Sequence, residues 1–437
     1  MTFAEARKYL LEQAKSAGLD AEILATESRT LSLESFEHKL AQITQATQGG
    51  IGVRVVKGGK TGYASTEERS KEALGWVLKE AAENAELQSD TGGFLPAGQA
   101  LGHKDLISEG LSAPIEEKAE AAHELEGGLR QDERTDQVPL TRYTESESEV
   151  SLSSTQGAEG GYRNGYAFLL SSLIMRQGES LKQVYDFNFE KEFHALEPGK
   201  TALKMIDKTS RMLGAKPLKT GRYRVYFEPS AFTQLMGLFV FMLSGKTVLE
   251  GKSRFADKLG QRVASELFTL TDDPLLPDGK GNRPFDSEGT PAQTLQLIEN
   301  GVLKSFFHNS ATAKALGQDN TGHASRSYKS TLGIGPSNLF VEPGEGVTLE
   351  KGVIITDMMG VHAGANPISG DFSLQAFGLN VEGGEVTHPV ENFALSGNLS
   401  ELLMNITAVG SELEWFPAGG ILGAPMVEVA ELSFAGE

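Results

Sequence analysis

Histidine and cysteine are the side chains that most often hold catalytic transition metals, and this chain has few ways to use them. Its 437 residues include no cysteine, which excludes disulfides, thiolate metal sites and cysteine nucleophiles. A helix-borne ligand pair needs two histidines three to five positions apart, and no two histidines here have that spacing. The histidines are His38, His103, His123, His194, His308, His323, His362 and His388. The sequence leaves open only a metal site whose ligands come from distant segments of the chain.

One histidine is followed by a glutamate, as in the helical motifs of zinc peptidases. His123 and Glu124 stand on a helix that we predict over residues 114–129. The positions one helical turn later are Gly127 and Gly128, so this helix face lacks a second ligand. We expect His123 to be a solvated residue on the helix surface.

The run Gly245-Lys246-Thr247 has the ending of a phosphate-binding loop. The full motif needs a glycine five positions before Gly245, and that position is Val240. The preceding run also does not read as a strand that ends in a glycine-rich loop. We therefore predict no nucleotide site in this segment.

Five carboxylates occur between positions 272 and 288. They are Asp272, Asp273, Asp278, Asp286 and Glu288. Calcium-binding loops place oxygen ligands at alternate positions with glycine at the sixth, and this spacing does not match. We expect solvated loop carboxylates here. A Ser-His-Asp triad is recognised by geometry, so the sequence assigns none.

The charge balance is acidic, with 59 Asp and Glu against 40 Lys and Arg and a formal net charge of -19. Nucleic-acid binding rests on clustered basic side chains, so a DNA-directed role is disfavoured. The chain does not open with a basic segment followed by an apolar one, and the apolar run at 231–243 is too short to cross a bilayer. We expect a cytoplasmic protein that contacts neither nucleic acid nor a membrane.

The chain length predicts more than one domain, and we place the main boundary near residue 219. Residues 1–219 predict an α+β domain with subregions at about 1–90 and 113–219, joined by a connection at 88–112. Helical spacing predicts helices at 3–17, 70–87, 114–129 and 199–213. Alternating apolar residues predict a hairpin at 51–66 and an antiparallel meander across 142–193, with turns at 157–165 and 177–179.

Residues 220–437 are rich in glycine and in short apolar runs, which predicts a mostly β domain and an α+β fold overall. A strand-like piece at 223–227 leads through Pro229 and Ser230 into an apolar helix at 231–243, with Ser230 as the N-cap. Asn300-Gly301, between two apolar runs, predicts a hairpin turn.

Several motifs resemble the TldD/PmbA family of two-subunit bacterial metallopeptidases, formerly described as modulators of DNA gyrase. These motifs lie at 50–55 with 62–66, 285–291, 321–324, 370–373 and 396–399, in the family's order over nearly the whole chain. In that family one type of subunit carries a His-Glu-x-x-x-His helix and a C-terminal cysteine. The corresponding places here are 231–238 and 417–420, which contain neither residue type.

The resemblance therefore implies the PmbA or TldE type of subunit, with no catalytic residue, metal ligand or cofactor of its own. A TldD-like, metal-bearing partner would hydrolyse unfolded or leader peptides. The resemblance also places some residues near a peptide cavity between the subunits: Gly322, His323, Gly370, Asp371, Phe372 and Ser373. A purely structural role for these turns is the alternative. For the whole chain, the alternatives are a homodimeric peptide-binding protein without catalysis and a metal-independent hydrolase.

Overall fold

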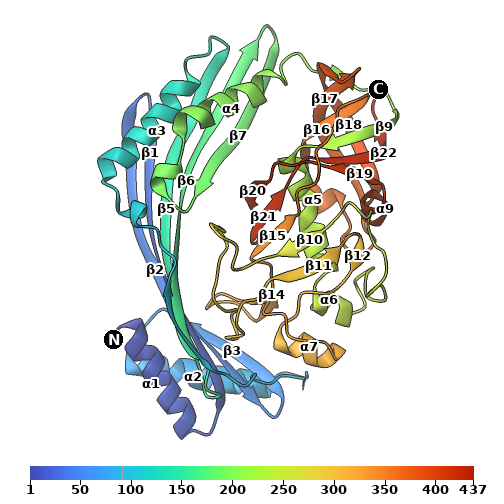
Figure 1. Ribbon diagram of the computed structural model, residues 1–437. Coiled ribbons are helices and arrows are strands. Elements are labelled where there is room, and N and C mark those ends of the chain that lie inside the picture. Colours follow the sequence, from blue (N-terminus) through green and yellow to red (C-terminus); the bar gives the residue numbers. More distant parts are fainter. Residues whose placement is uncertain (91) are drawn as a thin grey trace.

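A computed structural model describes residues 1–90 and 92–437 of the chain. Its N-terminal half is built on one long, curved, seven-stranded sheet (Figure 1). The strand order is β3-β2-β1-β5-β6-β4, and β7 also pairs with β6. The strands are β1 (Asp20–Phe36), β2 (Lys39–Lys57), β3 (Lys60–Thr66), β4 (Ala100–Asp105), β5 (Thr135–Ser154), β6 (Glu159–Gln177) and β7 (Ser180–Glu190).

Two pairs of helices cover separate ends of this sheet. One pair is α1 (Phe3–Ser16) and α2 (Lys71–Glu86), and the other is α3 (Ile115–Leu129) and α4 (Pro198–Ser210). Strand β1 reaches both cores, because Ile23 packs with the first pair and Leu31 with the second. The two predicted subregions therefore share one continuous sheet.

The pleat of β1 separates the two faces of the sheet. Side chains alternate between faces along a strand, and the odd-numbered Ile23 and Leu31 face the helices. The even-numbered Leu24 packs instead with Phe285, which belongs to the C-terminal half. The face without helices is therefore the face that meets the C-terminal half of the chain.

The C-terminal half contains two larger sheets and a central helix, α5 (Pro229–Met242). One sheet has the order β19-β22-β9-β16-β17-β18-β8 and the other the order β12-β11-β10-β15-β21-β20. Phe232 and Phe239 of α5 belong to one apolar core with Val225 of the first sheet and Leu339 of the second. Figure 1 shows α5 in the middle of this half.

The remaining elements connect and flank these sheets. The helical elements are η1 (Glu109–Ser112), η2 (Phe193–Ala195), α6 (Gly245–Leu249), α7 (Ser310–Leu316), α8 (Val361–Gly364) and α9 (Leu399–Met404). The strands are β8 (Lys216–Pro217), β9 (Gly221–Phe227), β10 (Leu270–Asp272), β11 (Leu295–Glu299), β12 (Val302–Leu303), β13 (Ala324–Ser325), β14 (Gly333–Ile334), β15 (Asn338–Val341), β16 (Gly352–Met359), β17 (Asp371–Glu382), β18 (Glu385–Asn398), β19 (Ile406–Val409), β20 (Glu414–Pro417), β21 (Ile421–Ala424) and β22 (Val427–Ala435).

The α+β fold with its strand-rich C-terminal half is confirmed, and three local predictions change. The connection expected at 88–112 contains β4 and η1, because β4 pairs in parallel with the start of β6. The turn expected over 157–165 is shorter, since β6 already begins at Glu159. The N-cap of α5 is Glu228 and not Ser230, because the helix begins at Pro229.

None of the described helices combines the length and the apolar character that a membrane crossing needs.

Candidate functional site

Helix α5 occupies the place where the resemblance expects metal ligands. Pro229 is its first helical residue, where the missing N–H costs no hydrogen bond. The preceding Glu228 is held by Arg211, with 2.7 Å between Oε1 and Nη2. Burial raises the pKa of Glu228 although Arg211 opposes that shift. The start of α5 is thus anchored to the residue that follows α4.

The second expected ligand segment lies against the same helix. Strands β20 and β21, joined at residues 418–420, both contact α5. The side chains that α5 buries are apolar or hydroxylic: Ala231, Phe232, Thr233, Leu235, Met236, Leu238, Phe239 and Met242. On its more open side, Gln234 donates a hydrogen bond of 2.8 Å to Asp357. Helix α5 therefore lies against the strands that flank residues 418–420, and neither 231–238 nor 417–420 contains a histidine or cysteine.

Across residues 1–90 and 92–437, no three His, Cys, Asp or Glu side chains form a group that could hold a metal ion. The nearest approach is a buried pair, with His323 Nε2 3.0 Å from Asp272 Oδ2. His323 Nδ1 is 2.9 Å from the hydroxyl of Thr321. Burial would raise the pKa of Asp272, but hydrogen bonds from His323 and Ser337 lower it below its ordinary value.

This Asp-His-Thr array has the connectivity of a hydrolase triad but not its accessibility. His323 is 1% exposed, Asp272 0% and Thr321 5%. The Thr321 hydroxyl also accepts from the His308 N–H and donates to the His308 carbonyl, so it is engaged on several sides. Because a nucleophile must reach a substrate carbonyl, this array favours a structural role over metal-independent hydrolysis.

The prediction that the acidic residues at 272–288 are solvated is wrong for three of the five. Asp272, Asp286 and Glu288 are buried, whereas Asp278 is exposed and Asp273 partly exposed. Buried carboxylates need partners, and each of the three has them in the fold. Asp272 and Glu288 find charged or polar partners in distant segments, which the local spacing could not show, whereas Asp286 also bonds to nearby backbone N–H groups.

Asp286 is held by backbone donors. Its carboxylate accepts from the N–H groups of Glu288 and Thr290 at 2.9 Å and of Ala324 at 3.0 Å. Burial, and then the charge of Glu288, raise the pKa of Asp286 to about 6. These bonds fix the turn in the 285–291 motif and hold it beside Ala324.

Glu288 belongs to a buried charge cluster that joins the two halves of the chain. Its Oε1 lies 2.8 Å from Arg54 Nη1, and Arg54 Nη2 lies 3.1 Å from Glu22 Oε2. Glu22 Oε1 in turn lies 2.8 Å from Arg326 Nη2. Burial opposes the charge on Arg54, but Glu22 and Glu288 outweigh that effect and raise its pKa. We call Glu22, Arg54, Glu288 and Arg326 the interdomain charge cluster.

The glycines of the 50–55 motif lie at the same junction. A Cβ on Gly52 would lie 2.3 Å from the Tyr328 carbonyl oxygen, and one on Gly50 would lie 2.2 Å from the Tyr328 ring. Tyr328 belongs to the C-terminal half, and its hydroxyl donates to Glu67 at 2.8 Å. These glycines are therefore required by the close approach of the two halves.

Residues 370–373 pair with the 396–398 motif on the neighbouring strand. Asp371 accepts a hydrogen bond of 2.7 Å from Asn398, and this bond lowers the pKa of Asp371. Ser373 accepts one of 2.9 Å from Ser396. Phe372 is buried, and Gly370 has a positive φ of 77° and packs near Met242 of α5. The strand pair thus presents Asp371 and Ser373 on an exposed face.

Gly322 and His323 lie elsewhere in the C-terminal half. Gly322 has a φ of 71° and approaches Pro291, and the His323 side chain points to Asp272. Among the described residues, the structure shows no hydrogen bond that joins these two to residues 370–373. Their shared place on a peptide cavity stays a prediction.

Two further residues singled out from the sequence lie apart from these sites. Lys246, from the segment that resembles the end of a phosphate-binding loop, is exposed on the short helix α6. His123, which the sequence predicts to be solvated, is partly buried beside Glu120.

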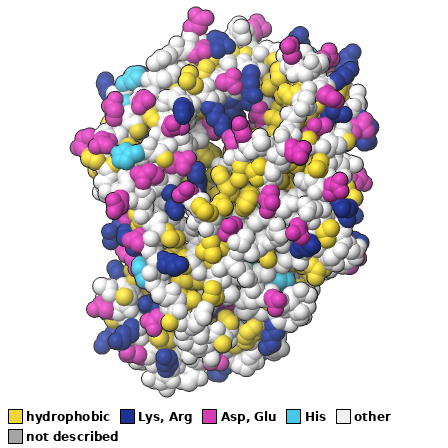
Figure 2. Space-filling model, viewed as in Figure 1, with side chains coloured by type: hydrophobic (Ala, Val, Ile, Leu, Met, Phe, Trp, Pro, Cys, Tyr) yellow, Lys and Arg dark blue, Asp and Glu magenta, His cyan; other side chains and the backbone are white. Residues whose placement is uncertain are grey.

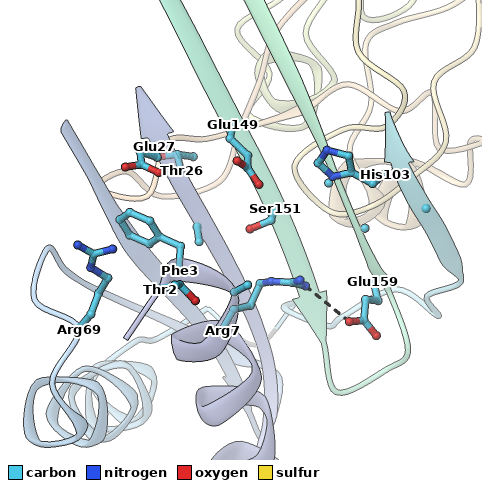
Figure 3. A pocket seen from close by; sticks show the side chains of 15 residues that line it. Thr2, Phe3, Arg7, Thr26, Glu27, Arg69, His103, Glu149, Ser151 and Glu159 are labelled. Atoms are coloured by element: carbon cyan, nitrogen blue, oxygen red, sulfur yellow. Dashed lines mark ion pairs between the residues drawn. The ribbon is translucent and has the colours of Figure 1, made fainter. Parts of the chain in front are cut away.

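A surface hollow with a volume of about 530 Å³ lies beside α1. Figure 3 shows Arg7 reaching from α1 toward Glu159, with Glu27 and Glu149 on neighbouring strands. Arg7 Nη1 donates to the Leu152 carbonyl at 2.8 Å and lies 3.9 Å from Glu159. Charged and uncharged side chains line this hollow, and among the residues that the structure describes no hydrogen bond pairs its Ser151 hydroxyl with its His103.

A second hollow, of about 340 Å³, separates the long sheet from the C-terminal half. Aromatic side chains line it from both sides, with Phe187 and Phe189 on β7 and Trp415 and Phe416 on β20. The sequence analysis did not single out these residues. The signal that was available is the alternation of two phenylalanines with polar residues in β7.

The chain matches three family models in order. They describe PmbA/TldA metallopeptidase domain 1 at residues 21–85, the central domain at 109–213 and the C-terminal domain at 220–436. A Haemophilus influenzae relative named metalloprotease PmbA homolog is 27% identical over 423 residues, covering 94% of this chain and 91% of the relative.

Solved structures agree with these matches. A Thermotoga maritima protein, named as a candidate modulator of a DNA gyrase, is 30% identical with a TM-score of 0.88, covering 99% of this chain and all of that one. TldE from Thermococcus kodakarensis is 23% identical, and its TM-score of 0.88 over 98% of this chain and 100% of that one shows the same fold. The chain therefore belongs to the PmbA/TldD family of metallopeptidases.

Proposed function

We propose that this chain is the subunit without a metal site in a two-subunit peptidase of the PmbA/TldD type. A metal-bearing relative performs the hydrolysis, and this chain forms part of the wall that holds an unfolded or leader peptide. The bound metal in that relative supplies an activated water for attack on the peptide bond. We place this assembly in the cytoplasm.

One observation carries the proposal. Helix α5 contacts strands β20 and β21, which flank residues 418–420, and neither the helix nor that segment contains a histidine or cysteine. Histidine nitrogen and cysteine sulfur are the ligands that such a site would use. A chain that has this helix and these strands without such ligands is suited to forming part of the peptide-binding wall and not to holding the metal.

Reconstitution tests the proposal. The purified chain, a metal-bearing relative from the same genome and an equimolar mixture are each incubated with an unstructured peptide, with and without a chelator. We expect the mixture to cleave the peptide, the chelator to stop cleavage, and this chain alone to be inactive. The matched control is a mixture in which the relative's helix glutamate is changed to glutamine, which must abolish cleavage.

Two outcomes would overturn the proposal. One is chelator-sensitive cleavage by this chain alone after repeated purification. The other is a stable homodimer that binds peptide and never associates with the relative, which would establish a peptide-binding protein without catalysis.

A further inference from the structure

Two strand edges face the hollow between the halves of the chain. Within the part of the chain that the structure describes, β7 pairs only with β6, and β20 pairs only with β21. Figure 1 shows β7 and β20 on opposite sides of this region, and Figure 2 shows hydrophobic side chains gathered in a hollow there. Strand edges with unpaired backbone groups are templates for an added strand.

The backbone of β7 shows which groups point away from β6. The Phe187 N–H donates to the Asp186 carboxylate at 2.8 Å, and the Phe189 carbonyl accepts from the Lys280 ammonium. Residues two apart in a strand direct their N–H and C=O groups to the same side. Phe187 and Phe189 therefore aim their backbone groups at the open edge, where side chains bind the Phe187 N–H and the Phe189 carbonyl.

Those side chains can be replaced by a peptide backbone. Asp186 also pairs with Lys208 at 3.2 Å, and Lys280 also pairs with Glu190 at 2.9 Å. Each therefore keeps an ionic partner if it releases the backbone of β7. An incoming strand would replace the hydrogen bonds from Asp186 and Lys280 with hydrogen bonds from its own backbone, and both side chains would keep their ionic partners.

The hollow combines aromatic surfaces with charged side chains from β7, α4 and β20. The Phe187 ring meets Phe416 edge to face at 6.5 Å, and Phe189 stacks on Phe168 at 4.4 Å. Trp415 lines the opposite wall and is only partly buried. Aromatic surfaces of this kind bind apolar side chains without demanding one particular residue.

We propose that the open edge of β7 binds an extended peptide by strand addition, with apolar side chains at alternate positions entering the hollow between β7 and β20. This rests on the proposed function, because it gives the supporting subunit a direct role in holding the peptide. The edge of β7 is the better template, since β20 has only four residues and ends at Pro417, which has no N–H to donate.

A fluorescence titration tests this inference on the full chain without a partner or metal. The chain has two tryptophans, so Trp76→Phe leaves Trp415, beside the hollow, as the only reporter. The probe is a short unstructured peptide with leucine at every second position and serine between. We expect saturable change in Trp415 emission, and none with a peptide in which the serines are replaced by proline.

Two substitutions at Phe187 distinguish the contribution of its backbone N–H to peptide binding from that of its aromatic ring. Phe187→Pro and Phe187→Leu both remove the ring, but only proline removes the outward N–H. We expect the proline variant to bind the peptide about tenfold more weakly than the leucine variant, the effect of one lost hydrogen bond. Leu181→Pro is the control, because Leu181 shares the outward orientation but lies outside the hollow. It should bind like the parent.

The outcomes separate this inference from the proposed function. Equal affinities for Phe187→Pro and Phe187→Leu, with folding verified by circular dichroism, would overturn strand addition at β7. Absence of any Trp415 response, together with cleavage by the reconstituted pair, would overturn this inference and leave the proposed function intact.

Discussion

Arg54 joins the two halves of the chain through buried ion pairs. It is 3% exposed and lies between Glu22 of the first half and Glu288 of the second. Glu288 also accepts from the backbone and hydroxyl of Ser310 at 2.9 and 2.6 Å. A charge that is buried this deeply is tolerated only because its partners are fixed around it.

Replacing Arg54 with methionine should therefore destabilise the fold by about 3–5 kcal/mol, since Glu288 would be left buried without its counter-charge. Urea unfolding at neutral pH, followed by circular dichroism, measures this. Lys79→Met is the control, because Lys79 and Glu83 form an exposed pair, and it should change stability by less than about 0.5 kcal/mol. Similar effects from both substitutions would contradict the assigned role of the cluster.

Asp286 should make stability depend on pH. Its pKa is raised from 3.8 to about 6, so the folded state binds the proton more tightly than the unfolded state. Its contribution to stability is therefore present below about pH 4 and lost as the pH rises through about 6. The stability of the parent relative to Asp286→Asn should fall by up to about 3 kcal/mol between pH 4 and pH 7.

Urea unfolding of both proteins at the two pH values checks this expectation. Asp278→Asn, the same substitution at an exposed aspartate of the same segment, serves as the control. A difference between the parent and Asp286→Asn that grows as the pH rises would have the wrong sign.

At the scale of elements, glycines in β2 and β3 allow neighbouring segments to pack closely against these strands. Gly52 sits where the Tyr328 backbone crosses β2, and Gly62 on β3 meets α2, where a Cβ would lie 2.1 Å from the Ala81 carbonyl oxygen. Both contacts involve backbone atoms that no change of rotamer can move. The glycines at 50–66 thus position α2 and the C-terminal half on the same sheet.

Gly52→Ala should destabilise the fold by about 1–3 kcal/mol, because the new Cβ must displace the backbone of the Tyr328 loop. Gly75→Ala is the matched comparison: Gly75 lies within α2, and a Cβ there meets nothing within 4 Å. That change should stabilise the fold by up to about 1 kcal/mol. Thermal unfolding of both variants tests the pair, and a neutral Gly52→Ala would contradict the docking contact.

Elements with local signals could be predicted from the sequence. The hairpin at Asn300-Gly301 forms as expected, with φ values of 47° and 77° that suit these two residues. Helices α1 and α2 begin within a residue of the starts that apolar spacing predicts, and in the structure Thr2 and Ser70 cap them. Such features depend on residues close together in the chain.

Features that depend on distant partners could not be predicted. Glu288 and Arg54 are 234 positions apart, and no local pattern shows that they meet. The hollow between β7 and β20 likewise joins Phe187 to Phe416, whose proximity follows from the packing of two halves. The candidate site is thus a product of tertiary structure more than of motif.

At the scale of the molecule, a curved sheet and a β-rich half flank a hollow lined partly by aromatic side chains, and helix α5 lies near it. Strand β20 belongs to both features, because it contacts α5 and lines the hollow. A peptide held on β7 would therefore lie opposite β20 in this hollow.

The central claim is that catalysis needs a metal which this chain does not hold. Native mass spectrometry, with elemental analysis of the same samples, measures bound metal in the purified chain and in its complex with a metal-bearing relative. We predict no tightly bound transition metal on the chain alone and metal in the complex, carried by the relative. A stoichiometric transition metal on the chain alone, held by side chains of residues 220–437, would contradict the account.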